Sequence, residues 1–299
     1  MAMRIPPELA EVCRDGVFSS ADALRVGVPT ARLGSWARSG LCTPLTRGWW
    51  TPGVPADDET RHRLTTKALL RHFGSKAFAS HQSALVLARL PLLDIDLTRV
   101  HLTRVSDRQS RRQPAFTLHP CLGRSLSTQQ RLAVAIVQAG AVNRPVSALA
   151  AADAALARRL ITRADLSHAC SVMERHPRTA TTRTALVHAD GRHESPGETR
   201  LAQVLRHLGV AATPQVSLEG DGLRYRVDFL LEDAPVVLEF DGRVKYGGGE
   251  DLFAEKRRED ALRRWGFEVV RVTWADLSHP ERIARWIEAA RRRSRARSA

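Results

Sequence analysis

Residues 226–242 read RVDFLLEDAPVVLEFDG and place three carboxylates, Asp228, Glu239 and Asp241, on two short apolar runs. Each run is rich in Val, Leu and Phe and about as long as a β-strand. The intervening residues 232–235 favour a turn, so the segment predicts a β-hairpin. Residues two apart on a strand share a face, which puts Glu239 and Asp241 on the same side of the sheet. Asp228 can face them from the neighbouring strand.

Carboxylates gathered beside apolar side chains repel one another and lose solvation, so a cation, a proton or a basic group has to compensate them. A hard divalent metal with oxygen ligands is the leading candidate. In the alternative interpretation, Asp228 and Asp241 are exposed strand-end residues and Asp241-Gly242 only makes a turn. A turn alone does not require Glu239 to interrupt so apolar a run, which favours the metal interpretation.

From Glu194 to about Leu277 the chain resembles the PD-(D/E)xK, restriction-endonuclease-like nucleases, specifically the group related to very-short-patch mismatch repair endonucleases. The resemblance rests on ESPGE at 194–198, VDF at 227–229, EFDG at 239–242, KRRED at 256–260 and GFEVVRVT at 266–273. It implies that Glu198, Asp228 and Glu239 hold Mg²⁺ or Mn²⁺, and that a lysine positions or activates the attacking water. The implied chemistry is metal-assisted hydrolysis of phosphodiester bonds, with Asp228 and Glu239 at the catalytic centre.

The chain departs from the family pattern at one position. The family has a lysine two residues after the Glu, and this chain has Asp241 there. Lys245 or Lys256 is therefore the candidate replacement for the catalytic lysine, and Asp241 becomes a candidate further metal ligand. Both lysines also have an ordinary interpretation, because Lys245 stands beside a glycine run at 247–249 and Lys256 belongs to a charged helix segment.

The order of elements in the C-terminal part predicts an α/β fold with helices packed on a mixed sheet. We expect helices at 196–208, 252–265 and 280–293, and strands at 215–218, 224–230, 236–240 and 268–272. The whole chain is then a multi-domain α+β protein. Its expected parts are a winged helix-turn-helix at 1–56, a mixed, mainly helical middle domain at 57–190, and the restriction-endonuclease-like domain at 191–299.

The N-terminal block predicts a DNA-binding module. A short capped helix at 21–26 is broken by Gly27-Val28-Pro29, a second helix runs from Thr30 to Ser39, and residues 41–51 have the pattern of a hairpin or wing. Two short helices around a tight turn are typical of a helix-turn-helix. With its wing, the segment resembles the N-terminal domain of the AbiEi-type antitoxins, which are transcriptional autoregulators of toxin systems.

In this interpretation the second helix enters the major groove of DNA, and the wing reaches a phosphate or the minor groove. The candidate DNA contacts are Thr30, Arg32, Ser35, Arg38 and Arg47. The resemblance also implies a possible toxin or other protein partner. The alternative is a winged helix used only as a protein-interaction module.

The charge balance agrees with a nucleic-acid partner. The chain carries 46 Lys and Arg against 32 Asp and Glu, a formal charge of +14, and its sequence pI is near 11.0. Such a surplus attracts a phosphate backbone and makes binding depend on salt. An arginine-rich composition from a high-GC genome explains part of it equally well. We found neither a membrane-length apolar run nor a signal core, and therefore expect a cytoplasmic protein without a membrane partner.

The middle region, 57–190, carries little chemical signal. Residues 106–113 are basic and polar, and we expect a loop that can lie against phosphates. The polar run Ser80-His81-Gln82-Ser83 either forms a small site or caps a helix, and capping is the simpler interpretation. The spacing of metal ligands is absent from the set His119, His176, His188 and His193. Two functions compete: a metal-dependent DNA endonuclease targeted by a winged helix, and a DNA-binding regulator or antitoxin-like protein whose nuclease-like domain is inactive.

Overall fold

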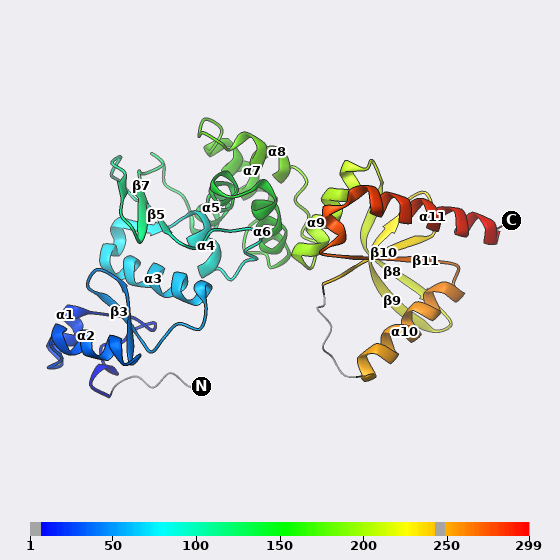
Figure 1. Cartoon of the computed structure of the whole chain (residues 1–299). Helices are drawn as coiled ribbons and strands as arrows, with labels where there is room; N and C mark the ends of the chain where they lie inside the picture. Colours follow the sequence, from blue (N-terminus) through cyan, green and yellow to red (C-terminus); the bar gives the residue numbers. More distant parts are fainter. Residues whose placement is uncertain (1–6, 243–248, 299) are drawn as a thin grey trace. The chain divides into compact units, whose positions relative to one another are not determined.

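The computed structural model describes residues 7–242 and 249–298, with the side chains of 249–255 and 298 left aside. The chain divides into two compact units (Figure 1). Unit 1 comprises residues 1–152 and 160–188, and unit 2 comprises 153–159 and 189–299. The predicted mixed, multi-domain α+β class is confirmed. The expected boundary between residues 56 and 57 lies inside unit 1 and stays a prediction.

Unit 1 begins with two short helices packed on a small antiparallel sheet of order β1-β3-β2. A capping box starts the first helix, because Ser19 accepts from the Asp22 N–H and the Asp22 carboxylate accepts from the Ser19 N–H. Gly27, with a φ of 82°, ends the turn between the helices in a conformation that favours glycine. The elements are α1 (Ser20–Arg25), α2 (Thr30–Arg38), β1 (Phe18–Ser19), β2 (Cys42–Thr46) and β3 (Trp49–Pro52).

A second sheet, of order β4-β5-β7-β6, forms the middle of unit 1. Its strands β5 and β7 are parallel, and the other pairs are antiparallel. Leu69 of α3 packs in the cluster formed by Val100, Leu102, Phe116 and Leu118, so α3 covers one face. The elements are α3 (Asp58–Phe73), β4 (Ala77–Ala79), α4 (His81–Leu87), β5 (Val100–Arg104), β6 (Arg111–Arg112) and β7 (Phe116–His119).

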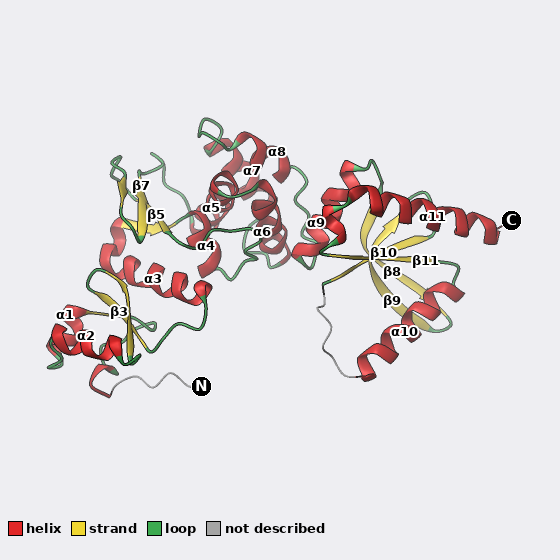
Figure 2. Ribbon diagram, viewed as in Figure 1, coloured by secondary structure: helices red, strands yellow, loops and turns green. Residues whose placement is uncertain are grey.

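The rest of unit 1 is helical (Figure 2). Helix α5 begins with a capping box of Ser127 and Gln130, and residues 133–140 along it are buried in succession. It contacts α4, α7 and α8. The last residues of α6 belong to unit 2. The helices are α5 (Thr128–Val142), α6 (Pro145–Ala157), α7 (Arg163–Val172) and α8 (Ala180–Leu186).

Unit 2 is built on a four-stranded mixed sheet of order β11-β10-β9-β8. Strand β10 pairs antiparallel with β9, as the hairpin prediction required, and parallel with β11. The elements are α9 (Pro196–His207), β8 (Ala212–Gly220), β9 (Leu223–Leu231), β10 (Val236–Asp241), α10 (Gly249–Arg264), β11 (Glu268–Thr273) and α11 (Pro280–Ser298). The order of helices and strands matches the sequence prediction, and α11 extends further than expected.

Helices cover both faces of this sheet (Figures 1 and 2). Leu201 of α9 and Ile283 of α11 pack with Leu238 on one face. Leu262 of α10 packs with Val237 on the other face. Alternation along β10 therefore sends neighbouring residues into two separate cores. The result is a three-layer arrangement that buries the central strands on both sides. Among the described residues, no helix is long and apolar enough to cross a bilayer.

Candidate active site and nucleic-acid interface

Strand β9 changes faces at Asp228. Val227 packs on the α10 side of the sheet, whereas Phe229, two residues later, packs in the core beneath α9 and α11. Residues two apart on a regular strand share a face, so the backbone turns over between them. The adjacent strand is irregular at the same level, because Gln215 falls between two paired positions and has a φ of 55°. Asp228 therefore lies at a break in the ladder.

At this break the side chain of Asp228 takes the place of a ladder carbonyl. Its Oδ2 accepts a hydrogen bond of 2.8 Å from the backbone N–H of Phe240. Desolvation raises the pKa of the Asp228 carboxyl, and repulsion from Glu198 and Glu194 acts in the same direction. The Phe240 N–H and the Arg258 guanidinium oppose that rise. Asp228 is thus held in an environment that resists its negative charge.

The start of α9 brings Glu198 to the same region. Ser195 caps the helix by accepting from the Glu198 N–H, and Oε2 of Glu198 accepts from the Glu194 N–H and from Nε2 of Gln215, both at 2.9 Å. Glu198 is 6% exposed. Gly197 permits this approach, because a Cβ there would stand 1.9 Å from the Phe240 ring. The predicted helix opening at 194–198 is present, and it carries Glu198 towards Asp228.

The third predicted ligand, Glu239, is paired with a cation. Arg258 Nη2 lies 2.5 Å from Oε1 of Glu239 and donates at 2.7 Å to the carbonyl of Arg226. The Glu239 side chain is 14% exposed and that of Arg258 32%. Sequence reasoning missed Arg258. It stands four residues before the buried Leu262, so helical spacing alone indicates that it faces the sheet.

The remaining predicted residues have different outcomes. Lys256 is exposed on α10, two residues before the arginine that contacts Glu239. Asp241 ends β10, half-buried, in register with Thr273. Lys245 lies outside the described residues. Within the described part of the chain, the carboxylates do not form a group of three ligands close enough to hold a metal. The structure brings Glu198 and Asp228 together, while Glu239 pairs with Arg258.

Two of the carboxylates have an oxygen atom that accepts no hydrogen bond from the described residues. Among the described residues, Oδ1 of Asp228 and Oε1 of Glu198 accept no hydrogen bond. Together with the raised pKa of Asp228, this is the electrostatic situation that a bound cation relieves. The donor set consists of carboxylate oxygens, which suit Mg²⁺ or Mn²⁺. Asp228 and Glu198 therefore offer oxygen atoms of the kind that a hard divalent ion binds, whereas Glu239 is paired with Arg258.

A buried aspartate anchors the start of α9. Asp153 is 1% exposed and accepts from the Asp190 N–H and the Thr199 hydroxyl, each at 2.7 Å. Its Oδ2 also lies 2.7 Å from Nδ1 of His193. Such a fully paired buried carboxylate fixes the chain that contacts it. Here it fixes residues 190–199, and with them Glu198.

The predicted DNA contacts lie on the surface of α2 and of the β2–β3 hairpin in unit 1. All five candidates, Thr30, Arg32, Ser35, Arg38 and Arg47, are exposed. Arg32 is engaged, since its guanidinium pairs with Glu8 at 3.1 Å and lies 4.7 Å from the Trp36 ring centroid. Arg38 and Arg47 form no ion pair with any described residue. The helix-and-wing surface is therefore available to a partner.

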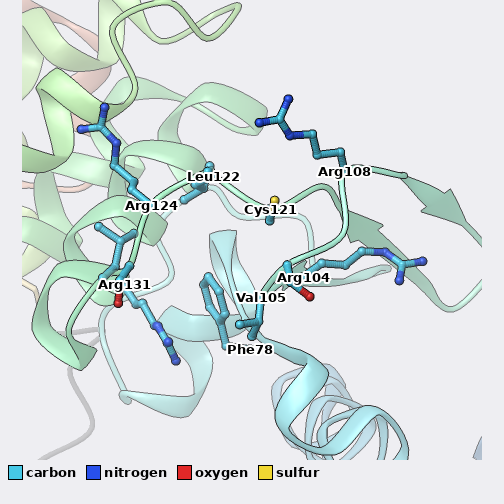
Figure 3. A pocket seen from close by; sticks show the side chains of 12 residues that line it. Phe78, Arg104, Val105, Arg108, Cys121, Leu122, Arg124 and Arg131 are labelled. Atoms are coloured by element: carbon cyan, nitrogen blue, oxygen red, sulfur yellow. The ribbon is translucent and has the colours of Figure 1, made fainter.

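Unit 1 also holds a basic pocket of about 420 Å³. It lies beside the loop at 106–113 that was expected to contact phosphates, part of which is strand β6. Figure 3 shows arginines on several sides of it, with Phe78 and Val105 lying between Arg131 and Arg104. The Arg131 guanidinium lies 4.5 Å from the Phe78 ring centroid, and Arg104 pairs with Asp107 at 2.8 Å. The arginines lining it are Arg104, Arg108, Arg124 and Arg131.

Comparisons with known proteins add little to this geometry. No protein-family model and none of the curated proteins match the chain. Among solved structures, the catalytic domain of the homing endonuclease I-Bth0305I is similar, at 17% identity and a TM-score of 0.25. The similarity covers 31% of this chain and 89% of that domain. A similarity of this size leaves function to be argued from the site itself.

Proposed function

We propose that the protein is a metal-dependent DNA endonuclease whose active site is in unit 2. The observation that supports this most is the environment of Asp228. The half-buried carboxylate of Asp228, at a strand irregularity, is repelled by Glu198 and accepts a hydrogen bond from the Phe240 N–H. A bound divalent cation relieves this repulsion between carboxylates. Such a site therefore binds the cation more strongly than a single ionised carboxylate on the surface does. The resemblance to very-short-patch repair nucleases points to the same chemistry.

The proposal gives each residue a role. Asp228 and Glu198 hold Mg²⁺ or Mn²⁺, and Glu239 joins them or stays with Arg258. When bound, the ion supplies a polarised phosphoryl oxygen and a more acidic water. Arg258, which contacts Glu239, takes the role of the missing lysine in this proposal. Its guanidinium suits the charge that develops on the phosphoryl oxygens.

Unit 1 delivers the nuclease to DNA in this proposal. Arg38 and Arg47 are exposed, carry no ion pair among described residues, and lie on the helix and wing that a winged helix-turn-helix presents to DNA. The basic pocket offers further guanidinium groups for phosphates. The net charge of +14 supplies the long-range attraction.

One observation favours the second candidate function, a DNA-binding regulator with an inactive nuclease-like domain. Asp241 stands where the family has its lysine, and Arg258 already neutralises Glu239. Glu239, already paired with an arginine, does not require a metal to compensate its charge. The resemblance of residues 8–54 to AbiEi-type antitoxins belongs to this alternative, as does a toxin partner.

The experiment is cleavage of supercoiled plasmid and of single-stranded DNA by the purified full chain, with Mg²⁺ or Mn²⁺ and beside EDTA. The test variants are Asp228→Asn and Glu239→Gln. The matched control is Glu219→Gln, which removes an exposed carboxylate of the same sheet that pairs only with exposed Arg224. We expect metal-dependent nicking that Asp228→Asn lowers at least about 100-fold and the control leaves unchanged.

Two results contradict the proposal. The first is absence of cleavage with either metal while salt-sensitive DNA binding persists, which supports the regulator. The second is equal cleavage by wild type and Asp228→Asn, which assigns the activity to another site or to a contaminant.

A further inference from the structure

Three histidines of unit 1, His81, His101 and His119, meet in space and are called the histidine cluster below. One ring nitrogen of each lies within 4.8 Å of the others. Among the described residues, this is the group of His, Cys, Asp and Glu side chains that comes close enough to hold a metal ion. The cluster lies in unit 1, so it is independent of the proposed nuclease site.

The fold brings the three together from separate elements. Strands β5 and β7 are parallel, with Thr103 in register with His119, so His101 and His119 project from the same face of the sheet. The start of α4 is tied to that face by two hydrogen bonds. The Ser80 N–H donates to the His101 carbonyl at 3.1 Å, and the His101 N–H donates to Oγ of Ser83 at 2.8 Å.

The rings are already close to the spacing of metal ligands. Nδ1 of His101 lies 2.9 Å from Nε2 of His119, with the two rings inclined by only 21°. Around a tetrahedral ion with metal–nitrogen distances of about 2.0–2.1 Å, ligand nitrogens stand about 3.4 Å apart. His81 is stacked on His119, with centroids 4.1 Å apart. An opening of about 0.5 Å between His101 and His119 and a tilt of His81 out of the stack complete the geometry.

The cluster holds nitrogen atoms with lone pairs and few partners. Desolvation lowers the pKa of His101 to about 3 and that of His119 to about 4, and it lowers the pKa of His81 well below 6.5. Among the described residues, the ring nitrogens of the cluster have two hydrogen-bond contacts. One joins His101 to His119, and the other joins Nδ1 of His81 to Oγ of Ser80 at 3.0 Å.

Two further features set this location apart from an ordinary packed core. His81 has a φ of 52°, in the left-handed region that a non-glycine residue rarely adopts. Thr103, on the same face as His101 and His119, is fully buried, and its hydroxyl has no hydrogen-bond partner in the described part of the chain. The sequence favoured Ser80 as a cap of α4. Its side chain makes no capping hydrogen bond and contacts the His81 ring instead.

We propose that His81, His101 and His119 bind one Zn²⁺ ion. Three imidazole nitrogens with no carboxylate form a donor set for a first-row transition metal and not for Mg²⁺ or Ca²⁺, which prefer oxygen. Zn²⁺ tolerates this irregular arrangement, because it has no geometric preference from its d-electrons. His81 keeps Ser80 as the partner of its second ring nitrogen, which fixes the orientation of a ligating histidine. The fourth tetrahedral position is left to water or another ligand.

The test uses the full chain without a histidine tag, stripped of metal and titrated with Zn²⁺ against a chromophoric chelator. We expect saturable uptake of one equivalent. His101→Asn and His119→Asn should each weaken this binding more than about tenfold. The control His188→Ala removes an exposed histidine of the same unit and should retain the full equivalent. Co²⁺ in place of Zn²⁺ should give the visible absorption of a tetrahedral nitrogen site in wild type.

A second readout requires no variant, in case a substitution prevents folding. X-ray absorption of zinc-loaded wild type should show imidazole nitrogens at about 2.0–2.1 Å, three per ion. The proposal is overturned if folded wild type takes up no zinc equivalent, or if folded His119→Asn binds zinc as tightly as wild type. A zinc shell made mainly of oxygen or sulfur also overturns it.

Discussion

The histidine cluster of unit 1 and the carboxylates of unit 2 place like groups side by side away from water, with opposite electrostatic results. In the histidine cluster, burial lowers the pKa of each base, so the groups are neutral and present lone pairs. In unit 2, burial raises the pKa of Asp228, and Arg258 neutralises Glu239. The histidine cluster is therefore uncharged, whereas Glu239 in unit 2 keeps its negative charge and is compensated by a neighbouring arginine.

This difference teaches which cation each site selects. Neutral nitrogen donors attract a borderline transition metal through its affinity for imidazole. Carboxylate oxygens attract a hard cation through charge. The same chain therefore offers two chemically distinct sites, and a change in one should leave the other intact. Each prediction below tests that independence or the sign of the electrostatics.

The largest expected effect comes from removing Asp153, the buried residue that holds the start of α9 and with it Glu198. Asp153→Ala leaves His193, Thr199 and the Asp190 N–H buried without their partner, so it should lower the free energy of unfolding of unit 2 by about 3–5 kcal/mol. Urea denaturation measures the loss. Zinc uptake by the histidine cluster should be unchanged at low temperature, and a parallel loss of zinc binding contradicts the independence of the two sites.

The second effect is a pH dependence of opposite sign in the two sites. His101 and His119 have pKa values of about 3 and about 4 when folded, against the ordinary histidine pKa of 6.5. The unfolded chain therefore binds more protons between about pH 6.5 and 4, and the stability of metal-free protein falls as pH decreases through that window. For Asp228 the pKa is raised, so its contribution is present below pH 3.8 and is lost as pH rises through the folded value.

Urea titrations of metal-free wild type and His119→Asn at pH 7.5, 5.5 and 4.5 measure the histidine part. Between pH 7.5 and pH 4.5, the free energy of unfolding should fall by at least about 1 kcal/mol less in the variant than in wild type. Equal losses indicate that the cluster does not supply the acid sensitivity. Asp228→Asn should instead gain stability relative to wild type at pH 7.5.

A smaller effect is expected from Arg258, the proposed replacement for the lysine of the nucleases that the sequence resembles. Arg258→Gln removes one positive charge beside Glu239, so it should tighten Mn²⁺ binding by up to about tenfold. Cleavage at saturating Mn²⁺ should nevertheless slow, because the guanidinium no longer faces the phosphate. Arg258→Lys should restore part of the rate. A variant that binds Mn²⁺ more tightly and also cleaves faster shows that Arg258 only competes with the metal.

The smallest effect belongs to DNA contact by unit 1. Arg38→Ala and Arg47→Ala should each weaken binding to duplex DNA by about two- to fivefold and reduce the salt slope by about one counterion. Arg175→Ala, an exposed arginine after α7, serves as the control. Equal effects at all three positions indicate diffuse attraction by the net charge rather than a winged-helix interface.

Much of the fold was predictable because local patterns determine it. Two apolar runs of strand length around a turn sequence identified the β9–β10 hairpin, and ESPGE at 194–198 identified the start of α9. The reversal of faces at Asp228 was not predictable, because it requires an irregularity in two paired strands at once. Arg258 was missed because its role depends on which face of α10 meets the sheet, although the spacing from Leu262 contained that information.

The histidine cluster was not predictable from the sequence spacing of metal ligands. His101 and His119 are 18 residues apart and meet through a parallel strand pair, whose register no local pattern reveals. His81 joins them only because α4 starts beside β5. Metal-ligand motifs are recognised when one helix or loop holds several ligands, and here each ligand comes from a different element.

The most direct test of two separate cation sites is equilibrium dialysis of the untagged full chain against Zn²⁺ and Mn²⁺, repeated for His119→Asn and Asp228→Asn. We predict that wild type binds both ions, that His119→Asn loses zinc and keeps manganese, and that Asp228→Asn loses manganese and keeps zinc. Binding of neither ion by folded wild type, or loss of both ions in one folded variant, contradicts the account.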